Sequence, residues 1–163
     1  MSLSGLSKRP HSFYAETPVR ILEITALLHT RFLPTIEKEY SMKKALIVDD
    51  SAYNRTLLNA ILRKKGMSVE TSDNGEDALV KFQALHPDIV FLDYIMPKKS
   101  GVEALAEMKK MNPDFIGVML TSISSAEDVQ AAKSAGANAY ILKPYEAEKI
   151  YEVLKKYRLI EEV

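Results

Sequence analysis

Carboxylates, a hydroxyl and a lysine follow the apolar runs of this sequence at the points where the runs end. Asp49 and Asp50 follow the first run, Asp93 the third, Thr121 the fourth and Lys143 the fifth. Three carboxylates that meet at close range repel one another, and one of them stays protonated unless a cation lies among them. Oxygen ligands without His or Cys select a hard cation, and Mg²⁺ suits a few carboxylates plus water. The residue types therefore predict Mg²⁺ as a cofactor.

The lysine and the hydroxyl would add donors for an anion beside that cation. Lys143 brings an ammonium group and Thr121 a hydroxyl. Carboxylates act as phosphoryl acceptors, and phosphoryl transfer needs little beyond positioning and charge neutralisation. The set therefore predicts a site that stabilises a phosphoryl group on one aspartate.

The elements that must position these groups are five short apolar runs alternating with amphipathic stretches. The runs are 45–48, 67–69, 89–92, 115–120 and 137–142. Several are apolar throughout, which is typical of strands covered on both faces. Because parallel strands need crossover connections, strand–helix alternation predicts a parallel sheet with helices on both faces. The expected fold is α/β, a flavodoxin-like doubly wound sheet of five strands in the order 2-1-3-4-5, with ligands beyond the strands' carboxyl ends.

Capping residues mark the starts of the intervening helices. Ser100 with Glu103, and Ser124 with Glu127, have the spacing of a capping box. Asn74 is an N-cap for a helix that ends near residue 85. The first and last helices are expected over 51–65 and 145–157.

Composition narrows the class of protein. The 163 residues carry 22 basic and 22 acidic side chains, so there is no basic excess for a nucleic-acid backbone or an anionic lipid surface. A hydrophobic share of 47% argues against disorder. No apolar run approaches the roughly 18 residues of a membrane span, and the absence of Cys fits a reducing compartment. We expect a small cytoplasmic protein without a nucleic-acid or membrane partner.

Residues 1–41 do not share the strand–helix rhythm. Thr17 and Pro18 have the pattern of an N-cap followed by N1 proline, which predicts a helix over about 18–32. Two interpretations stay open: an extension from an upstream start or added for expression, and a native helix that packs on the domain or on another subunit.

The strand ends form a recognisable set of motifs. They are ALIVDDS at 45–51 with Arg55, PDIVFLDYIMP at 87–97, SG at 100–101, TS at 121–122, GA at 136–137 and YILKP at 140–144. With these motifs, residues 42–163 resemble the receiver domain of two-component response regulators, the CheY-like family. The expected domains are therefore an N-terminal extension over 1–41 and a receiver domain over 42–163.

The resemblance implies a role for each residue of the site. Asp93 is the phosphoacceptor and a metal ligand. Asp50 binds Mg²⁺ directly, Asp49 holds it partly through water, and the backbone carbonyl of Ile95 completes the protein ligands. Lys143 pairs with the phosphoryl group and, before phosphorylation, with Asp93.

Two further residues would form the switch. In the family pattern Thr121 moves to hydrogen-bond the phosphoryl oxygen, and Tyr140 then turns inward into the space that Thr121 leaves. This movement reshapes the face made by the fourth helix, the fifth strand and the fifth helix of the 42–163 unit, where a downstream protein binds. The lysine–proline bond at 143–144 is often cis in this family.

The function implied is that of a stand-alone receiver in signal transduction, not an enzyme with turnover. A histidine kinase or a histidine phosphotransfer protein would phosphorylate it, and output would come through protein–protein contact. No helix-turn-helix or basic recognition helix is visible, so DNA binding is not expected. The expected oligomeric state is a monomer or a weak dimer.

The sequence departs from common receivers at two positions that are often polar. Ile95 lies two residues after the acceptor, and Ile123 lies two residues after Thr121. Both positions flank the path of the attacking water in the family, so we expect these apolar side chains to slow loss of the phosphoryl group.

Other functions weigh less on the same residues. A haloacid-dehalogenase-like phosphatase would place a second Asp where Ile95 stands, and a flavin or nucleotide module would need a Gly- or Ser/Thr-rich phosphate loop in place of Asp49 and Asp50. A receiver that acts as an interaction module without phosphorylation stays open. Taken alone, the aspartates could also be turn or N-cap residues.

Overall fold

The computed structural model describes residues 42–161. The helix expected over 18–32 and the role of residues 1–41 lie outside the described residues. Strands and helices alternate without exception in the described range. The elements are β1 (Lys44–Val48), α2 (Ala52–Arg63), β2 (Ser68–Ser72), α3 (Gly75–Leu85), β3 (Ile89–Asp93), α4 (Gly101–Met111), β4 (Ile116–Thr121), α5 (Ala126–Ser134), β5 (Ala139–Leu142) and α6 (Ala147–Lys156).

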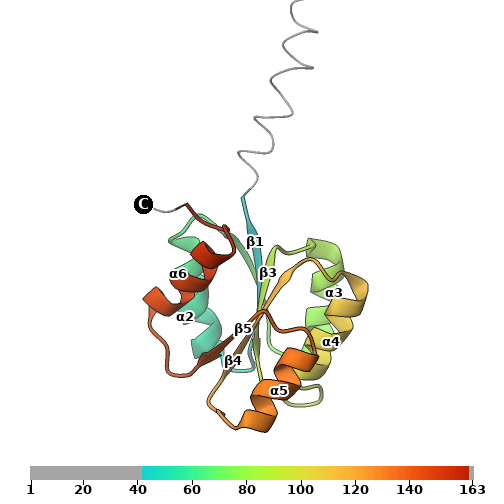
Figure 1. Cartoon of the computed structure of the whole chain (residues 1–163). Coiled ribbons are helices and arrows are strands. Elements are labelled where there is room, and N and C mark those ends of the chain that lie inside the picture. Colours follow the sequence, from blue (N-terminus) through green and yellow to red (C-terminus); the bar gives the residue numbers. More distant parts are fainter. Residues whose placement is uncertain (1–41, 162–163) are drawn as a thin grey trace, which may run out of the picture. The chain divides into compact units, whose positions relative to one another are not determined.

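The strands form one parallel sheet in the order β2-β1-β3-β4-β5, which confirms the predicted topology. Helices α2 and α6 lie on one face of this sheet, and α3, α4 and α5 lie on the other (Figure 1). Every connection between paired strands therefore crosses over through a helix, as parallel pairing requires.

Side chains that alternate along the central strands build two separate cores. On one face Ile47 of β1 packs with Leu58 of α2 and Ile150 of α6. On the other face Leu46 packs with Phe82 of α3. All five are 0–2% exposed. Because β1 is covered on both faces, its run is apolar throughout instead of alternating.

Local capping agrees with the sequence at two helices and differs at a third. Asn74 caps α3, and Ser100 with Glu103 forms a complete capping box on α4. The prediction of Ser124 as the cap of α5 is wrong: the cap is Ser125, whose hydroxyl accepts from the backbone N–H of Asp128. Both serines have an acidic residue three positions later, so spacing alone could not separate them.

The edge strand β2 is also displaced from its predicted position. The apolar run at 67–69 pointed to its start, but the strand is 68–72 and includes exposed Glu70. An edge strand has one neighbour and is less covered than the centre, so its second half is not apolar.

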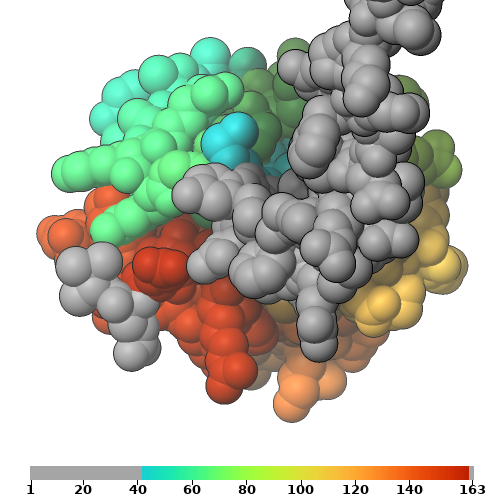
Figure 2. Space-filling view, turned by 90° about the horizontal axis from the view of Figure 1, so that it is seen from above, coloured from blue at the N-terminus to red at the C-terminus, as the bar shows by residue number. Residues whose placement is uncertain are grey.

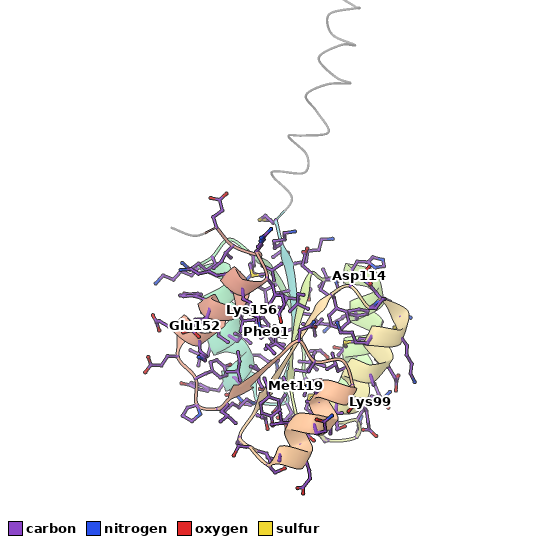
Figure 3. The ribbon with its side chains drawn as sticks, in the orientation of Figure 1. Phe91, Lys99, Asp114, Met119, Glu152 and Lys156 are labelled. Carbon is purple, nitrogen blue, oxygen red and sulfur yellow. The ribbon has the colours of Figure 1, made fainter. Side chains whose placement is uncertain are left out.

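The two edges of the sheet carry different loops. Phe91 and Met119 lie in the middle of the sheet, Asp114 lies at the edge where the strands begin, and Lys99 lies at the edge where they end (Figure 3). We call these the amino edge and the carboxyl edge. Figure 2 looks onto the amino edge, with the blue-green α2–β2 region and the red α6 on its left and the yellow α4 on its right.

Candidate functional site

Three aspartates meet at the carboxyl edge. Asp49 and Asp50 follow β1, and Asp93 is the last residue of the adjacent strand β3. Carboxylate oxygens of the three lie within 4.8 Å of one another. The Asp49 side chain is 1% exposed and that of Asp93 is 14% exposed. The parallel register of β1 and β3 therefore brings together residues that are 44 positions apart in the chain.

Lys143 supplies the positive charge of the cluster. Its Nζ lies 2.7 Å from Oδ2 of Asp49 and 3.1 Å from Oδ2 of Asp93. The Lys143 backbone N–H donates to the Thr121 carbonyl at 2.7 Å, which fixes the loop after β5 against the end of β4. The sequence predicted the contact with Asp93, whereas the shorter contact is with Asp49. The peptide bond from Lys143 to Pro144 is cis.

Helix α2 contributes two residues whose roles the sequence did not predict. The Nδ2 of Asn54 donates to Oδ1 and Oδ2 of Asp49 at 3.2 and 3.1 Å. A guanidinium nitrogen of Arg55 donates to the backbone carbonyls of Asp49 and Asp50 at 2.7 and 3.1 Å. Their positions five or six residues after Asp49, in the first turn of a helix, were the available signal.

The acidic cluster affects the titration of its own members and of a neighbour. Burial raises the pKa of Asp93; the Lys143 ammonium opposes this shift, and the charge of Asp49 adds to it. Burial, together with the negative charges of Asp49 and Asp93, raises the pKa of Tyr145 to about 12. The cluster therefore holds more negative charge than Lys143 balances, which is the condition under which a cation binds.

The two predicted switch residues lie beside the β4–α5 loop. Thr121 is 1% exposed, and its Oγ1 accepts from the Ile123 backbone N–H at 3.0 Å. The hydroxyl of Tyr140, a half-buried side chain, donates to the Ile123 carbonyl at 2.7 Å. Both side chains therefore hold the same residue of the loop, from its N–H and from its carbonyl.

A third contact to this loop region starts at the residue after Asp93. The Tyr94 hydroxyl donates to Oδ1 of Asp128 at 2.8 Å, and the other Asp128 oxygen accepts from the Ser125 hydroxyl. Burial and the hydrogen bond to Asp128 raise the pKa of Tyr94 to about 12. The sequence did not predict this link between β3 and the start of α5.

The two isoleucines at the positions that are often polar in the family differ in solvent exposure. Ile95 is 57% exposed, and Ile123 is half-buried. The backbone N–H of Ile95 hydrogen-bonds the Asp93 carboxylate, which lowers the pKa of Asp93 against the effect of burial. The Ile95 backbone thus lies against the Asp93 carboxylate while its side chain is exposed.

The residues present fit Mg²⁺. The donor set is oxygen only, it carries more negative than positive charge, and the Asp50 side chain is exposed at the mouth of the cluster. Mg²⁺ binds through one or two carboxylates and keeps several waters. Asp50, Asp93 and the Ile95 carbonyl, with Asp49 behind them, match that demand.

Comparison with known proteins identifies the family. A family model described as the response regulator receiver domain matches residues 45–155. The chemotaxis protein CheY of Thermotoga maritima is 36% identical over 115 residues, which cover 70% of this chain and 96% of that protein. The CheY of Halobacterium salinarum is 34% identical over 69% of this chain and 93% of its own. The chain therefore belongs to the response regulator receiver family of two-component systems.

Solved structures agree with this assignment. A CheY-like receiver from Methanospirillum hungatei has a TM-score of 0.70 and 30% identity, covering 73% of this chain and 94% of that one. A CheX–CheY complex with BeF₃ and Mg²⁺ from Borrelia burgdorferi contains a chain with a TM-score of 0.67 and 28% identity, over 71% of this chain and 89% of that one. CheY-like receivers are phosphoacceptor switches that work with histidine kinases and downstream targets. Among residues 42–161, no helix has the length and apolarity to cross a membrane.

Proposed function

We propose that this protein is a two-component response regulator that is phosphorylated on Asp93. The observation that carries this proposal is the cluster of three aspartates at the carboxyl edge, two of which, Asp49 and Asp93, contact Lys143. Membership of the receiver family gives the class of protein, and the cluster supplies the acceptor, the charge partners and the donors that phosphoryl transfer requires.

The metal would be held by Asp50, Asp93 and the carbonyl of Ile95, with Asp49 acting through water. Mg²⁺ bound there would neutralise charge on the phosphoryl oxygens. In the transfer itself, a carboxylate oxygen of Asp93 attacks phosphorus. The bond from phosphorus to the imidazole nitrogen of a phosphohistidine donor breaks, and that nitrogen keeps the electron pair. Lys143 then pairs with the new phosphoryl group instead of with Asp93.

Thr121 and Tyr140 would carry the signal away from Asp93. Thr121, whose Oγ1 now accepts from the Ile123 N–H, would move so that its hydroxyl donates to a phosphoryl oxygen. Tyr140 would then turn inward into the space that Thr121 leaves. Both residues hold Ile123, so a change at one reaches the other through a single residue.

The output surface would be the α5–β5–α6 face. An open groove of about 480 Å³ lies on its β5–α6 side, lined by Tyr140 and by residues that follow it in the chain. The remaining lining residues are Ile141, Leu142, Pro144, Tyr145, Glu146, Glu148, Lys149 and Glu152. Because Tyr140 belongs both to the switch and to this groove, a change in its position would alter the surface offered to a downstream protein.

The domain over 42–163 would act on its own in the cytoplasm, as a monomer or weak dimer, with a histidine kinase or phosphotransfer protein as donor. The matched region covers 93–98% of three CheY relatives but 44% of a probable transcriptional regulator of Cyanophora paradoxa. The likeness to these CheY relatives supports output through protein contact. No turnover of a separate substrate is proposed.

Intact mass after incubation with acetyl phosphate and Mg²⁺ tests the proposal. The wild-type chain should gain one phosphoryl group, and EDTA or the variant Asp93→Asn should abolish the gain. Asp88→Asn, which removes an aspartate at the amino edge, is the matched control and should label like the wild type. Absence of labelling in the wild type, under conditions that label another receiver, would instead favour an unphosphorylated interaction module.

A further inference from the structure

Asn54 makes a contact for which neither the sequence nor the proposed function supplies a role. Its side-chain amide donates to both oxygens of the Asp49 carboxylate, with Nδ2 at 3.2 Å from Oδ1 and 3.1 Å from Oδ2. Asp49 is 1% exposed, and Asn54 is half-buried. This contact binds a buried carboxylate of the acidic cluster, so it affects which carboxylate oxygens are available to a cation.

The hydrogen bonds to Asp49 use its whole accepting capacity. An ionised carboxylate has two oxygens with about four lone-pair positions. Oδ1 accepts from the Ser51 backbone N–H at 2.9 Å and from Asn54, and Oδ2 accepts from Lys143 at 2.7 Å and from Asn54. Two of the four contacts therefore come from Asn54, and no position is left for a direct metal bond.

The start of α2 fixes Asn54 in this place. The hydroxyl of the N-cap Ser51 accepts from the Asn54 backbone N–H at 3.4 Å, so the residue lies in the first turn of the helix. The guanidinium of the next residue, Arg55, donates hydrogen bonds to the backbone carbonyls of Asp49 and Asp50. The amide is thus held between the helix and the loop that carries both aspartates.

We propose that Asn54 is a positioning residue that competes with the cation for Asp49. Its amide keeps Asp49 as a carboxylate that acts on the metal through water, and it leaves direct ligation to Asp50 and Asp93. The inference rests on the proposed metal site. On this basis the site should favour Mg²⁺, which keeps much of its water, over Ca²⁺, which takes six to eight direct oxygen ligands.

Manganese titration of Asn54→Ala and Asn54→Leu tests this role, with free Mn²⁺ followed by electron paramagnetic resonance. Removing the amide leaves fewer donors on Asp49, so a cation should take their place. Mn²⁺ should bind about tenfold more tightly, the equivalent of one charge-assisted hydrogen bond. Ca²⁺ should gain more than Mg²⁺ in competition with Mn²⁺. Asn59→Ala, a change on the same helix away from the cluster, should bind Mn²⁺ like the wild type.

The outcomes separate this role from a structural one. Damage to the site would weaken Mn²⁺ binding and leave the order of Ca²⁺ and Mg²⁺ unchanged, so equal or weaker binding by both variants overturns the inference. Asn54→Leu keeps the branched shape and the number of side-chain heavy atoms, and thermal unfolding in EDTA shows whether each variant is folded. A wild-type chain that binds no Mn²⁺ and takes no phosphoryl group would overturn the proposed function itself. A wild type that does both, beside variants that bind no more tightly, would remove the role of Asn54 alone.

Discussion

The two edges of one sheet use aspartate and lysine in opposite ways. At the amino edge Asp88 has a single ion pair, with Lys43 at 3.1 Å, and also accepts from the Lys44 backbone N–H at 2.8 Å. The Lys43 side chain is 46% exposed and the Asp88 side chain is 32% exposed. At the carboxyl edge Asp49 and Asp93 share Lys143, Asp50 lies beside them, and Asp49 is 1% exposed.

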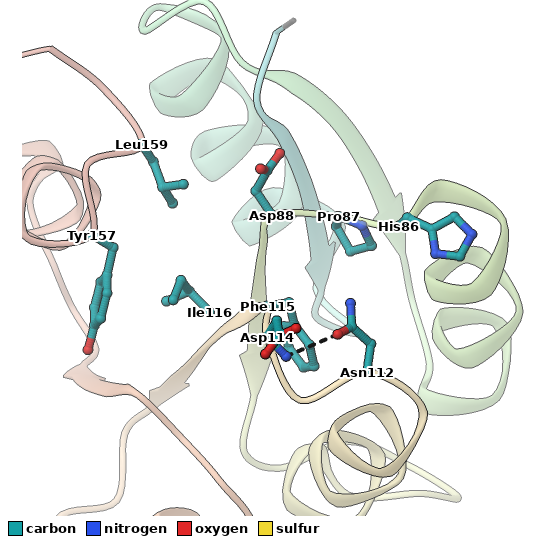
Figure 4. A pocket seen from close by; sticks show the side chains of 9 residues that line it. All are labelled: His86, Pro87, Asp88, Asn112, Asp114, Phe115, Ile116, Tyr157 and Leu159. Carbon is teal, nitrogen blue, oxygen red and sulfur yellow. Dashed lines mark hydrogen bonds between the residues drawn. The ribbon is translucent and has the colours of Figure 1, made fainter. Parts of the chain in front are cut away.

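The amino edge also has a hollow, and one of the two aspartates that line it, Asp88, is paired with Lys43. A groove of about 380 Å³ lies at the starts of β3 and β4 (Figure 4). Its lining mixes apolar side chains such as Phe115 and Ile116 with Asn112, whose side chain accepts from the Asp114 backbone N–H at 3.0 Å. Burial and unbalanced charge, not the presence of a groove or of acidic residues, therefore distinguish the edge at which we propose phosphorylation from the amino edge.

Removing the lysine at each edge should give the largest contrast. Lys143→Met leaves Asp49 and Asp93 without their cation, and breaking a buried pair in this way costs about 3 kcal/mol of the free energy of unfolding. Lys43→Met breaks an exposed pair and should cost less than about 1 kcal/mol. Urea unfolding in EDTA measures both. Mg²⁺ should restore part of the loss in the first variant only; equal losses would mean that the two edges do not differ in this respect.

The next largest difference between the two edges should come from replacing one glycine at each edge. A Cβ at Gly101 would lie 1.9 Å from the Asp93 carbonyl oxygen, so the backbone of the acceptor must shift. Gly101→Ala should cost about 2 kcal/mol, within the range for overpacking, and should slow labelling by acetyl phosphate. Gly66, at the amino edge, has φ +76° and nothing within 4 Å of the added carbon. Gly66→Ala should cost only the conformational strain of about 1 kcal/mol and leave labelling unchanged; slowed labelling there would contradict the contrast.

Neutralising one aspartate at each edge should shift stability in opposite directions. The pKa of Asp93 is higher in the folded chain than in the unfolded chain. The contribution of Asp93 to the free energy of unfolding is therefore fully present below its unfolded pKa and is lost as the pH rises through its folded pKa. An amide avoids that loss. In EDTA at neutral pH, Asp93→Asn should therefore raise the Tm by a few degrees, and the gain should vanish below about pH 4.

The matched change Asp88→Asn should lower the Tm slightly at neutral pH, because Asp88 loses its ion pair with Lys43. Scanning calorimetry across the pH range measures both variants. A Tm of Asp93→Asn that equals the wild-type value at neutral pH would contradict the unbalanced charge of the carboxyl edge.

The smallest expected effect concerns the lifetime of the phosphorylated state. Ile95→Asn and Ile123→Glu place polar groups at the positions that flank the water path in the family, and we expect loss of the phosphoryl group to speed up by less than about tenfold, or about 1.4 kcal/mol. As a control, Val80→Asn replaces another β-branched apolar side chain, which is 67% exposed on α3, and should leave the rate unchanged. The rate follows from intact mass after acetyl phosphate is removed; unchanged rates in both isoleucine variants would refute this interpretation.

Much of the fold could be predicted because its signals are local. A strand covered on both faces must be apolar along its length, as β1 and β3 are, and polar residues directly after it mark its carboxyl end. The parallel arrangement then placed Asp49, Asp50 and Asp93 at one edge. The weaker signals failed where two candidates satisfied the same local rule, as with Ser124 and Ser125, or where an edge strand lacked cover, as with β2.

The sequence by itself determined which residue types stand at the strand ends, and with them the class of chemistry. The tertiary structure decided how those groups pair: Lys143 lies closer to Asp49 than to Asp93, Asn54 donates to both oxygens of Asp49, and Tyr94 donates to Asp128. The physical reason is one of range. The pattern of apolar residues is local and can be read directly from the sequence. A hydrogen bond between side chains instead depends on rotamers and on where separate loops meet after packing.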